Sequence, residues 1–473
     1  MHNFSFLTTS IKGKNDNFND KITFAKNLIK QEYYKNDLPW VIGYSGGKDS
    51  TFLVDLIISS ILELDKNQLN KKIYILSSDT LVENPLVIES LSNSINNIND
   101  FAKINNLPLI AALVRPKIEE SFWVNLIGRG YPAPNQTFRW CTSRLKIDSM
   151  SNYVGEKISK DKKVIYVIGV RQGESGARDK ILEKYNNLSN DRYVNKHNTD
   201  ANAFVFKPII DFDTKEVWEY LLSKPSTHWK VSTGNLYELY RDSSNECPLA
   251  LDQIGTKKVN SSCGNSRWGC WTCTVAKEDR SITNLINNGY KELESLRDFR
   301  NWLQDERDKF ENRYLGSIRI NKSTKKITLV KNRTMRLKYK EKDTKKILFI
   351  PKKNTRPSKN WEILKNGWAV SDDGKYKIIS KDKFINLIKT NKINMWNEIG
   401  NPFARKIIIH FKDNDYRIPG IGPYNLRYRK EIYDKLTKLN SNNNFQNLIL
   451  EEEREIIFSI WNNIENNLTN CTR

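Results

Sequence analysis

The chain has 473 residues, of which 38% are hydrophobic and 28% are charged. This composition excludes both a bundle of membrane-spanning helices and a wholly disordered chain, and the length suits two or three domains. Lysine and arginine outnumber aspartate and glutamate by 77 to 55, a formal charge of +22, which favours polyanionic partners such as nucleic acids. A general enrichment in lysine is an alternative source of this charge. Only clustering of the positive residues along the chain would therefore indicate a binding segment.

Between residue 19 and about residue 230, apolar strands alternate with amphipathic helices, which is typical of an α/β fold with a parallel sheet. The predicted strands cover residues 40–44, 72–77, 109–114, 164–170 and 204–210, and the clearest helices cover 49–64 and 86–105. Asp213 and Glu216 stand three residues apart, which predicts a capping box before a helix over 217–222. The polar, asparagine-rich residues 186–202 predict a loop or mobile lid.

Composition along the chain predicts three parts. Residues 1–240 form the α/β domain, residues 241–300 contain four of the six cysteines, and residues 301–473 form a basic C-terminal domain. Within the last part, residues 321–360 hold 15 lysines and arginines against two acidic residues, a net charge of +13. We expect this segment to bind DNA or a partner protein, and a solvated basic hairpin is the alternative. Residues 441–446 resemble a linker before a last helix over 448–463.

The cysteines and the N-terminus indicate the compartment. Six cysteines in 473 residues are too few for a secreted disulfide scaffold. Residues 1–14 lack the apolar core of a signal peptide, and no stretch approaches the roughly 18 uninterrupted apolar residues of a membrane helix. We therefore expect a cytoplasmic protein without membrane contacts.

A glycine-rich loop joins the first predicted strand to the helix that follows it. It consists of Tyr44, Ser45, Gly46, Gly47, Lys48, Asp49 and Ser50. Glycine amides and a helix N-terminus can together bind a polyphosphate. A Walker A loop would need glycine at Ile42 and serine or threonine at Asp49, so this is not a Walker-type ATPase. A plain glycine turn capped by serine is the alternative.

The loop resembles the PP-loop of ATP pyrophosphatases, which cleave ATP between the α and β phosphates. The resemblance implies that Lys48 neutralises phosphate charge and that Asp49 positions Mg²⁺. It also implies that the pyrophosphate is held by Ser45, Gly46, Gly47 and Ser50.

Three further segments follow the loop: Asp79 with Thr80, residues 169–175 with Arg178, and residues 207–211. In this order they resemble the phosphoadenylyl-sulfate reductase branch of this superfamily, and the resemblance covers roughly residues 38–225. It implies a Rossmann-like parallel sheet of the adenine-nucleotide alpha-hydrolase type, with its ligand at the strand ends. Arg171 and Arg178 are expected to clamp phosphate, with surface salt bridges as the alternative. The other residues expected at the nucleotide are Asp79, Thr80, Gly169, Glu174 and Ser175.

The cysteines form two segments that could share a metal. Cys263, Cys270 and Cys273 are spaced C-x6-C-x2-C, and Cys141 lies far upstream. With only four histidines in the chain, we favour an all-cysteine site, and the residues alone leave Zn²⁺ and an iron-sulfur cluster level. Adenylyl-sulfate reductases hold a [4Fe-4S] cluster with a cysteine pair and a distant C-x2-C, so the resemblance favours the cluster. Because the first segment here has one cysteine, Cys263 would supply the missing ligand.

Two cysteines remain. Cys247 is either a persulfide carrier or a buried apolar residue. Cys471 stands near the C-terminus but lacks the E-C-G context of the catalytic cysteine in the reductases. The chain also has a long basic extension that the reductases lack, which disfavours reductase activity.

Five motifs combine along the chain. They are the glycine-rich loop, the segment 139–146 around Cys141, the segment 169–175, the C-x6-C-x2-C string, and a segment near the end with Pro419, Gly420, Tyr424, Arg427, Arg429 and Lys430. Together they resemble the DndC-type family of DNA phosphorothioation sulfurtransferases along nearly the whole chain. This resemblance implies that ATP adenylates a DNA backbone phosphate with release of pyrophosphate, and that sulfur then replaces a non-bridging oxygen. It also implies a cysteine desulfurase as sulfur donor and other subunits of a phosphorothioation complex as partners. The alternatives are a PP-loop tRNA thiolase, a phosphoadenylyl-sulfate reductase-like enzyme, and a zinc-stapled nucleic-acid-binding subunit with an inert PP-loop.

Overall fold

The fold was analysed in a computed structural model of the chain. It describes residues 15–136, 138–161, 163–172, 191–197, 202–244, 269–309, 312–315, 317–320, 327–330, 334–335, 338–340, 347–349, 362–363, 369–370, 376–378, 410–412, 415–419, 421–442, 445 and 447–469. The chain forms two compact units. Unit 1 comprises residues 1–122, 134–300 and 443–448, and unit 2 comprises residues 123–133, 301–442 and 449–473.

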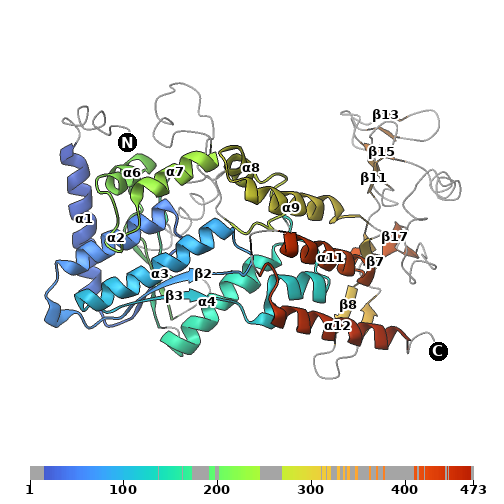
Figure 1. The fold of residues 1–473 in the computed structure, drawn as a ribbon, viewed down its shortest axis with the longest axis horizontal. Helices are drawn as coiled ribbons and strands as arrows, with labels where there is room; N and C mark the ends of the chain where they lie inside the picture. Colours follow the sequence, from blue (N-terminus) through green and yellow to red (C-terminus); the bar gives the residue numbers. More distant parts are fainter. Residues whose placement is uncertain are drawn as a thin grey trace. The chain divides into compact units, whose positions relative to one another are not determined.

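Unit 1 is built on a six-stranded sheet in the order β3-β2-β1-β4-β6-β5. Two neighbouring strands of this sheet, β2 and β3, are labelled in Figure 1. The first five strands in this order are parallel, and β5 runs antiparallel to β6. This arrangement confirms the predicted α/β, Rossmann-like fold. The strands are β1 (Trp40–Gly43), β2 (Ile73–Ser78), β3 (Leu109–Val114), β4 (Ile165–Val167), β5 (Val194–Lys196) and β6 (Phe204–Phe206).

Helices connect these strands and continue beyond the sheet. They are α1 (Asn15–Tyr34), α2 (Lys48–Leu62), α3 (Pro85–Asn105), α4 (Asp148–Tyr153), α6 (Thr214–Leu222), α7 (Thr233–Ser244), α8 (Arg280–Asn287) and α9 (Glu294–Glu306). Two π-helical segments, Thr142–Ile147 and Val154–Ile158, flank α4. Short 3-10 turns cover Lys66–Gln68, Ile118–Glu120 and Lys291–Leu293.

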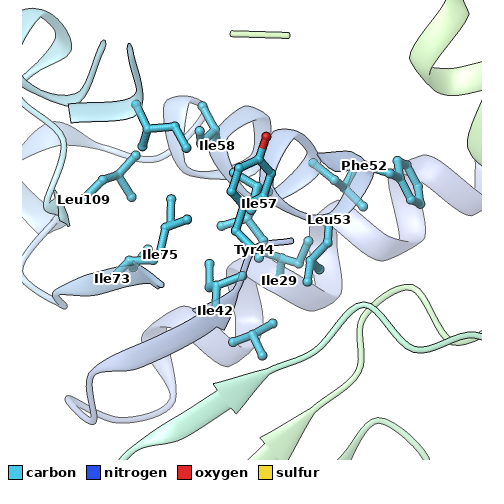
Figure 2. Packing of buried hydrophobic residues seen from close by; sticks show 14 of the residues in the cluster. Ile29, Ile42, Tyr44, Phe52, Leu53, Ile57, Ile58, Ile73, Ile75 and Leu109 are labelled. Atoms are coloured by element: carbon cyan, nitrogen blue, oxygen red, sulfur yellow. The ribbon is translucent and has the colours of Figure 1, made fainter. Parts of the chain in front are cut away.

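Alternation along the strands places apolar side chains on both faces of the sheet, as a parallel sheet covered on both sides requires. On one face the strands pack against α1, α2, α3 and α6 in the main core. Figure 2 shows part of this packing, with Ile29, Ile42, Tyr44, Phe52, Leu53, Ile57, Ile58, Ile73, Ile75 and Leu109. The opposite face carries a smaller core in which Val41, Tyr74 and Leu76 pack with Val154.

The sequence located most of these elements to within a few residues. The predicted helix over 217–222 begins earlier, at Thr214, and its capping box is present: Asp213 Oδ1 accepts from the Glu216 amide at 2.7 Å, and the Asp213 amide donates to Glu216 Oε2 at 2.8 Å. The strands predicted over 164–170 and 204–210 are only three residues long. In the second of these, Pro208 follows and has no amide hydrogen for the ladder.

One expectation about a loop is wrong in part. Within the segment 186–202, Val194–Lys196 is an ordered edge strand that pairs with β6. The polar composition did not predict a strand, because strands inside a parallel sheet are usually apolar. An edge strand has only one hydrogen-bonded neighbour and tolerates polar side chains. Residues 186–190 and 198–201 of this segment lie outside the described residues.

Unit 2 contains short strands and two long helices. The strands are β7 (Arg313–Leu315), β8 (Ser317–Ile320), β9 (Ile327–Val330), β10 (Thr334–Met335), β11 (Lys338–Lys340), β12 (Ile347–Phe349), β13 (Glu362–Ile363), β14 (Ala369–Val370), β15 (Tyr376–Ile378), β16 (His410–Lys412), β17 (Asp415–Pro419) and β18 (Ile421–Tyr424). The helices are α11 (Leu426–Asn442) and α12 (Glu451–Thr469). The π-helical segment Val124–Gly128, from much earlier in the chain, packs against both helices. No helix in the described parts of the chain is long and apolar enough to span a membrane.

Buried Arg429 fastens the segment 123–133 inside unit 2. Its guanidinium donates to the carbonyl oxygens of Tyr424 at 2.7 Å and Gly128 at 2.9 Å. The Tyr424 hydroxyl accepts from the Ala133 amide at 3.0 Å. In the described structure these motif residues hold backbone together inside the unit.

Candidate functional site

The glycine-rich loop lies between the end of β1 and the start of α2. Ser50 ties it together: its hydroxyl accepts from the Ser45 amide at 3.2 Å and donates to the Gly47 carbonyl at 2.9 Å. Gly46 has a φ of +71°, a left-handed conformation that glycine adopts without strain. The predicted phosphate-binding residues therefore form one compact turn at a helix N-terminus, where backbone amides favour anions.

Three charged side chains meet at the start of α2. Lys48 Nζ lies 3.0 Å from Asp49 Oδ2, and Arg171 Nε lies 2.6 Å from Asp49 Oδ1. Burial lowers the pKa of Lys48, but the Asp49 carboxylate and the Tyr240 hydroxyl together outweigh it, so this pKa lies above its ordinary value. Lys48 therefore stays cationic at neutral pH, as a phosphate-neutralising residue must.

Arg171 is fixed from several sides. It is only 2% exposed, and it also donates to the Phe212 carbonyl at 3.3 Å and to the Thr214 hydroxyl at 3.2 Å. Its described contacts orient Asp49, and its predicted contact with phosphate stays a prediction. Gly169, beyond the end of β4, lies against the Asp49 backbone, so the end of β4 adjoins the loop.

Asp79 and Thr80 follow β2 at the same edge of the sheet. Asp79 accepts from Arg115 at 2.8 Å and from the Leu81 amide at 2.9 Å. The Thr80 hydroxyl donates to Glu83 at 3.0 Å and lies 3.3 Å from the sulfur of Cys270. Because β1 and β2 are adjacent parallel strands, their carboxyl ends bring the phosphate loop and a cysteine to one edge.

The Cys270–Cys273 turn is attached to the segment after β2. The Trp271 amide donates to the Val82 carbonyl at 3.0 Å, Glu83 and Cys270 form a β-bridge, and the Cys273 amide donates to the Cys270 carbonyl at 3.0 Å. Burial and the Glu83 carboxylate raise the pKa of the Cys270 thiol. A compensating cation is close, since Lys146 Nζ lies 3.0 Å from Glu83 Oε1.

Three of the four predicted metal ligands share this region. Burial and the neighbouring Cys273 sulfur raise the pKa of Cys141, and Cys273 also contributes to the raised pKa of Cys270. The described residues nevertheless contain no group of three cysteine, histidine or acidic side chains arranged to hold a metal ion. Cys263 lies outside the described residues. The thiols present suit a soft metal by their chemistry, and the four-cysteine ligand set stays a prediction.

Arg300 of α9 clasps the chain that follows Cys273. Its buried guanidinium donates to the carbonyl oxygens of Cys273 at 2.8 Å and Lys277 at 3.1 Å, and also to that of Ala276. One side chain therefore fixes three carbonyl groups in the five residues that begin with Cys273.

A cavity of about 470 Å³ borders the phosphate loop. Ser45 and Gly46 line it, together with residues of α3 and α7. One polar stripe of α3 faces it, made of Ser90, Asn93, Ser94 and Asn97. Its volume is within the usual range of small-molecule sites.

Some residues predicted for the site are not described by the structure, and some residues that the structure places at the site were not predicted. Glu174, Ser175, Arg178, Cys247 and Cys263 lie outside the described residues. The sequence did not single out Glu83, Tyr240 or Arg300, because each acts through contacts with residues far away along the chain. Lys146 did have a signal, since it closes the segment that contains Cys141.

Comparison with known proteins agrees with this architecture. The phosphoadenosine phosphosulfate reductase domain matches residues 39–276, which is 238 of 473 residues. The α/β sheet and its glycine-rich loop thus define a protein of the PP-loop class. The chain belongs to the phosphoadenosine phosphosulfate reductase domain family.

Individual relatives are distant. An uncharacterized protein of Methanocaldococcus jannaschii is 26% identical over 228 residues, which are 48% of this chain and 40% of that protein. The phosphoadenylyl-sulfate reductase of Candida auris has 12% identity and a TM-score of 0.28, covering 44% of this chain and 84% of its own. The U34-tRNA thiolase of Methanococcus maripaludis, solved with its [4Fe-4S] cluster, has 13% identity and a TM-score of 0.28. The match covers 62% of this chain and 81% of the thiolase.

Proposed function

We propose that the protein is an ATP-dependent sulfurtransferase that adenylates a DNA backbone phosphate and assists replacement of a non-bridging oxygen by sulfur. One observation carries this proposal: the Cys270 sulfur lies 3.3 Å from Thr80 at the sheet edge that also holds the phosphate loop. A nucleotide-activating loop and a sulfur site side by side suit an enzyme that activates an oxygen and then replaces it with sulfur.

The proposed reaction solves a leaving-group problem. A non-bridging phosphodiester oxygen does not leave unaided, so it first attacks the α-phosphorus of ATP. The new O–P bond replaces the bond to the β-phosphate, and pyrophosphate leaves. A persulfide sulfur then attacks the DNA phosphorus, and AMP leaves with the original oxygen. A thiol next attacks the carrier sulfur of the new P–S–S linkage, which forms a disulfide with the carrier and leaves one sulfur on DNA.

The residues of the loop would supply the electrostatics of the first step. Lys48 and the loop amides would stabilise the charge that develops on pyrophosphate. Asp49, held by Arg171 at 2.6 Å, would position Mg²⁺, with Asp79 at the neighbouring strand end. The cavity beside Ser45 gives room for part of the nucleotide.

A metal group completes the proposal. Cys141, Cys263, Cys270 and Cys273 would hold a [4Fe-4S] cluster, with Zn²⁺ as the alternative. When bound, the group would supply the chemistry of a thiolate-ligated metal at the sheet edge that also holds the phosphate loop. We also propose a cysteine desulfurase as the sulfur donor and further subunits of a phosphorothioation complex as partners.

The first prediction tests the loop. Lys48→Ala and Asp49→Ala should each lower ATP-dependent sulfur incorporation into DNA by about 100-fold or more, because they remove charge stabilisation of the transition state. DNA affinity should stay nearly constant, and the exposed Lys66→Ala variant should match the wild type. Chromatography of the products should show AMP and pyrophosphate.

Two results would contradict this proposal. ADP with orthophosphate as products would show cleavage at the wrong phosphate. Incorporation of sulfur into tRNA but not DNA would identify a thiolase instead.

A further inference from the structure

Tyr240 of α7 reaches the phosphate loop from 192 residues along the chain. Its hydroxyl oxygen accepts a hydrogen bond from the Lys48 backbone amide at 3.1 Å. Lys48 Nζ also lies 5.4 Å from the centre of the Tyr240 ring. The tyrosine therefore touches the loop through both its hydroxyl and its ring.

The loop is shaped to admit this hydroxyl. A Cβ atom on Gly47 would lie 2.8 Å from the Tyr240 hydroxyl oxygen, closer than a real side chain allows. From behind, the Tyr240 ring packs edge-on against Trp218, with ring centres 5.3 Å apart and an interplanar angle of 80°. Glycine in front and tryptophan behind hold the ring in place.

The amide that Tyr240 occupies is one that an anion would use. Lys48 is the first residue of α2, and Gly47, its N-cap, has no side chain to satisfy the free amides there. Such amides bind phosphate oxygens in nucleotide sites. A neutral phenol oxygen now takes one of these donors.

We infer that Tyr240 sets the affinity of the loop for pyrophosphate by competing for the Lys48 amide. This inference rests on the proposed function, in which pyrophosphate is the first product. When pyrophosphate binds, one of its oxygens replaces the hydroxyl at the amide. When it leaves, the hydroxyl returns and spares the amide from being unpaired. Tyr240 is thus a positioning residue that favours product release.

The test is titration calorimetry of the full-length protein with pyrophosphate, with and without Mg²⁺. Tyr240→Phe keeps the ring and removes the competing oxygen, so pyrophosphate should bind about threefold to tenfold more tightly. Tyr237→Phe is the matched control, because Tyr237 packs on the same Trp218 at 5.3 Å and 85°. This control should bind like the wild type.

The possible outcomes separate the inference from the proposed function. Unchanged affinity in Tyr240→Phe would overturn the inference, and weaker binding would overturn it too by making the hydroxyl a phosphate ligand. If either outcome occurs while Lys48→Ala still abolishes binding, the proposed function survives. Absence of pyrophosphate binding in the wild type, or its insensitivity to Lys48→Ala, would overturn both.

Discussion

Asp55 is a fully buried carboxylate in the middle of α2, at 0% exposure. It accepts from the Tyr220 hydroxyl at 2.9 Å and from the His228 amide at 3.0 Å, and it pairs with Lys224 and with His228 Nδ1. A buried charge is tolerated only when it is paired and hydrogen-bonded in this way. These four contacts come from three residues, Tyr220, Lys224 and His228, and they tie α2 to α6 and to the segment after it.

These contacts predict how stability depends on pH. Burial raises the pKa of Asp55, but the hydrogen bond from His228 and the charge of Lys224 outweigh it and hold the pKa at about 2, against an ordinary value of 3.8. A lowered carboxyl pKa stabilises the folded state above about pH 4, and this contribution is lost as the pH falls toward 2. The contribution is about 2 kcal/mol.

Urea unfolding at pH 6 and pH 3 measures this contribution. The wild type should lose stability between these values, and Asp55→Asn should be less stable at pH 6 with a smaller change on acidification. Asp100→Asn, at an exposed position, is the control. Equal pH dependence in the wild type and Asp55→Asn would show that other groups cause the acid sensitivity.

At the scale of elements, the cysteine turn depends on α9. Arg300 holds three carbonyl groups with one planar guanidinium, a geometry that lysine cannot reproduce. Arg300→Lys should therefore loosen the turn and lower the metal content of anaerobically purified protein. Cys270→Ser, which removes a proposed ligand outright, sets the lower limit.

Iron, zinc and sulfide analysis of the same preparations gives the readout. The matched control is Arg297→Lys, one turn earlier on α9, where the arginine pairs with Glu294 and Asp298. Its metal content should equal that of the wild type. Full metal content in Arg300→Lys would show that the clasp does not shape the ligand set, and iron against zinc decides which group is bound.

Periodicity explains what the sequence predicted about these elements. The core strands β1 to β3 and the helices α2 and α3 were located because their apolar residues repeat with the period of the element. The phosphate loop was located because its residues are contiguous. The clasp by Arg300 and the contact of Tyr240 with Lys48 were not predictable, because each joins residues that only the folded chain brings together. The edge strand Val194–Lys196 was missed because its residues are largely polar.

At the scale of the whole molecule, positive charge is concentrated in one segment of the sequence. Residues 321–360 hold +13 of the total charge of +22. Attraction between such a segment and DNA arises mainly from release of counterions, so affinity falls linearly with salt on logarithmic axes. The slope counts the phosphates that are neutralised, at about 0.9 per phosphate.

Replacing two of these charges should therefore change the slope by a predictable amount. Lys345→Gln with Lys346→Gln should reduce its magnitude by about 2 and weaken DNA binding at low salt. ATP cleavage at the loop should be unaffected in the absence of DNA.

Lys66→Gln with Lys103→Gln, at exposed positions of unit 1, is the control for general charge and should leave the slope unchanged. Fluorescence anisotropy with a labelled duplex over a range of salt concentrations measures both slopes. Equal slopes for the two double variants would mean that the basic segment does not contact DNA, and an acidic partner protein would become the proposed ligand.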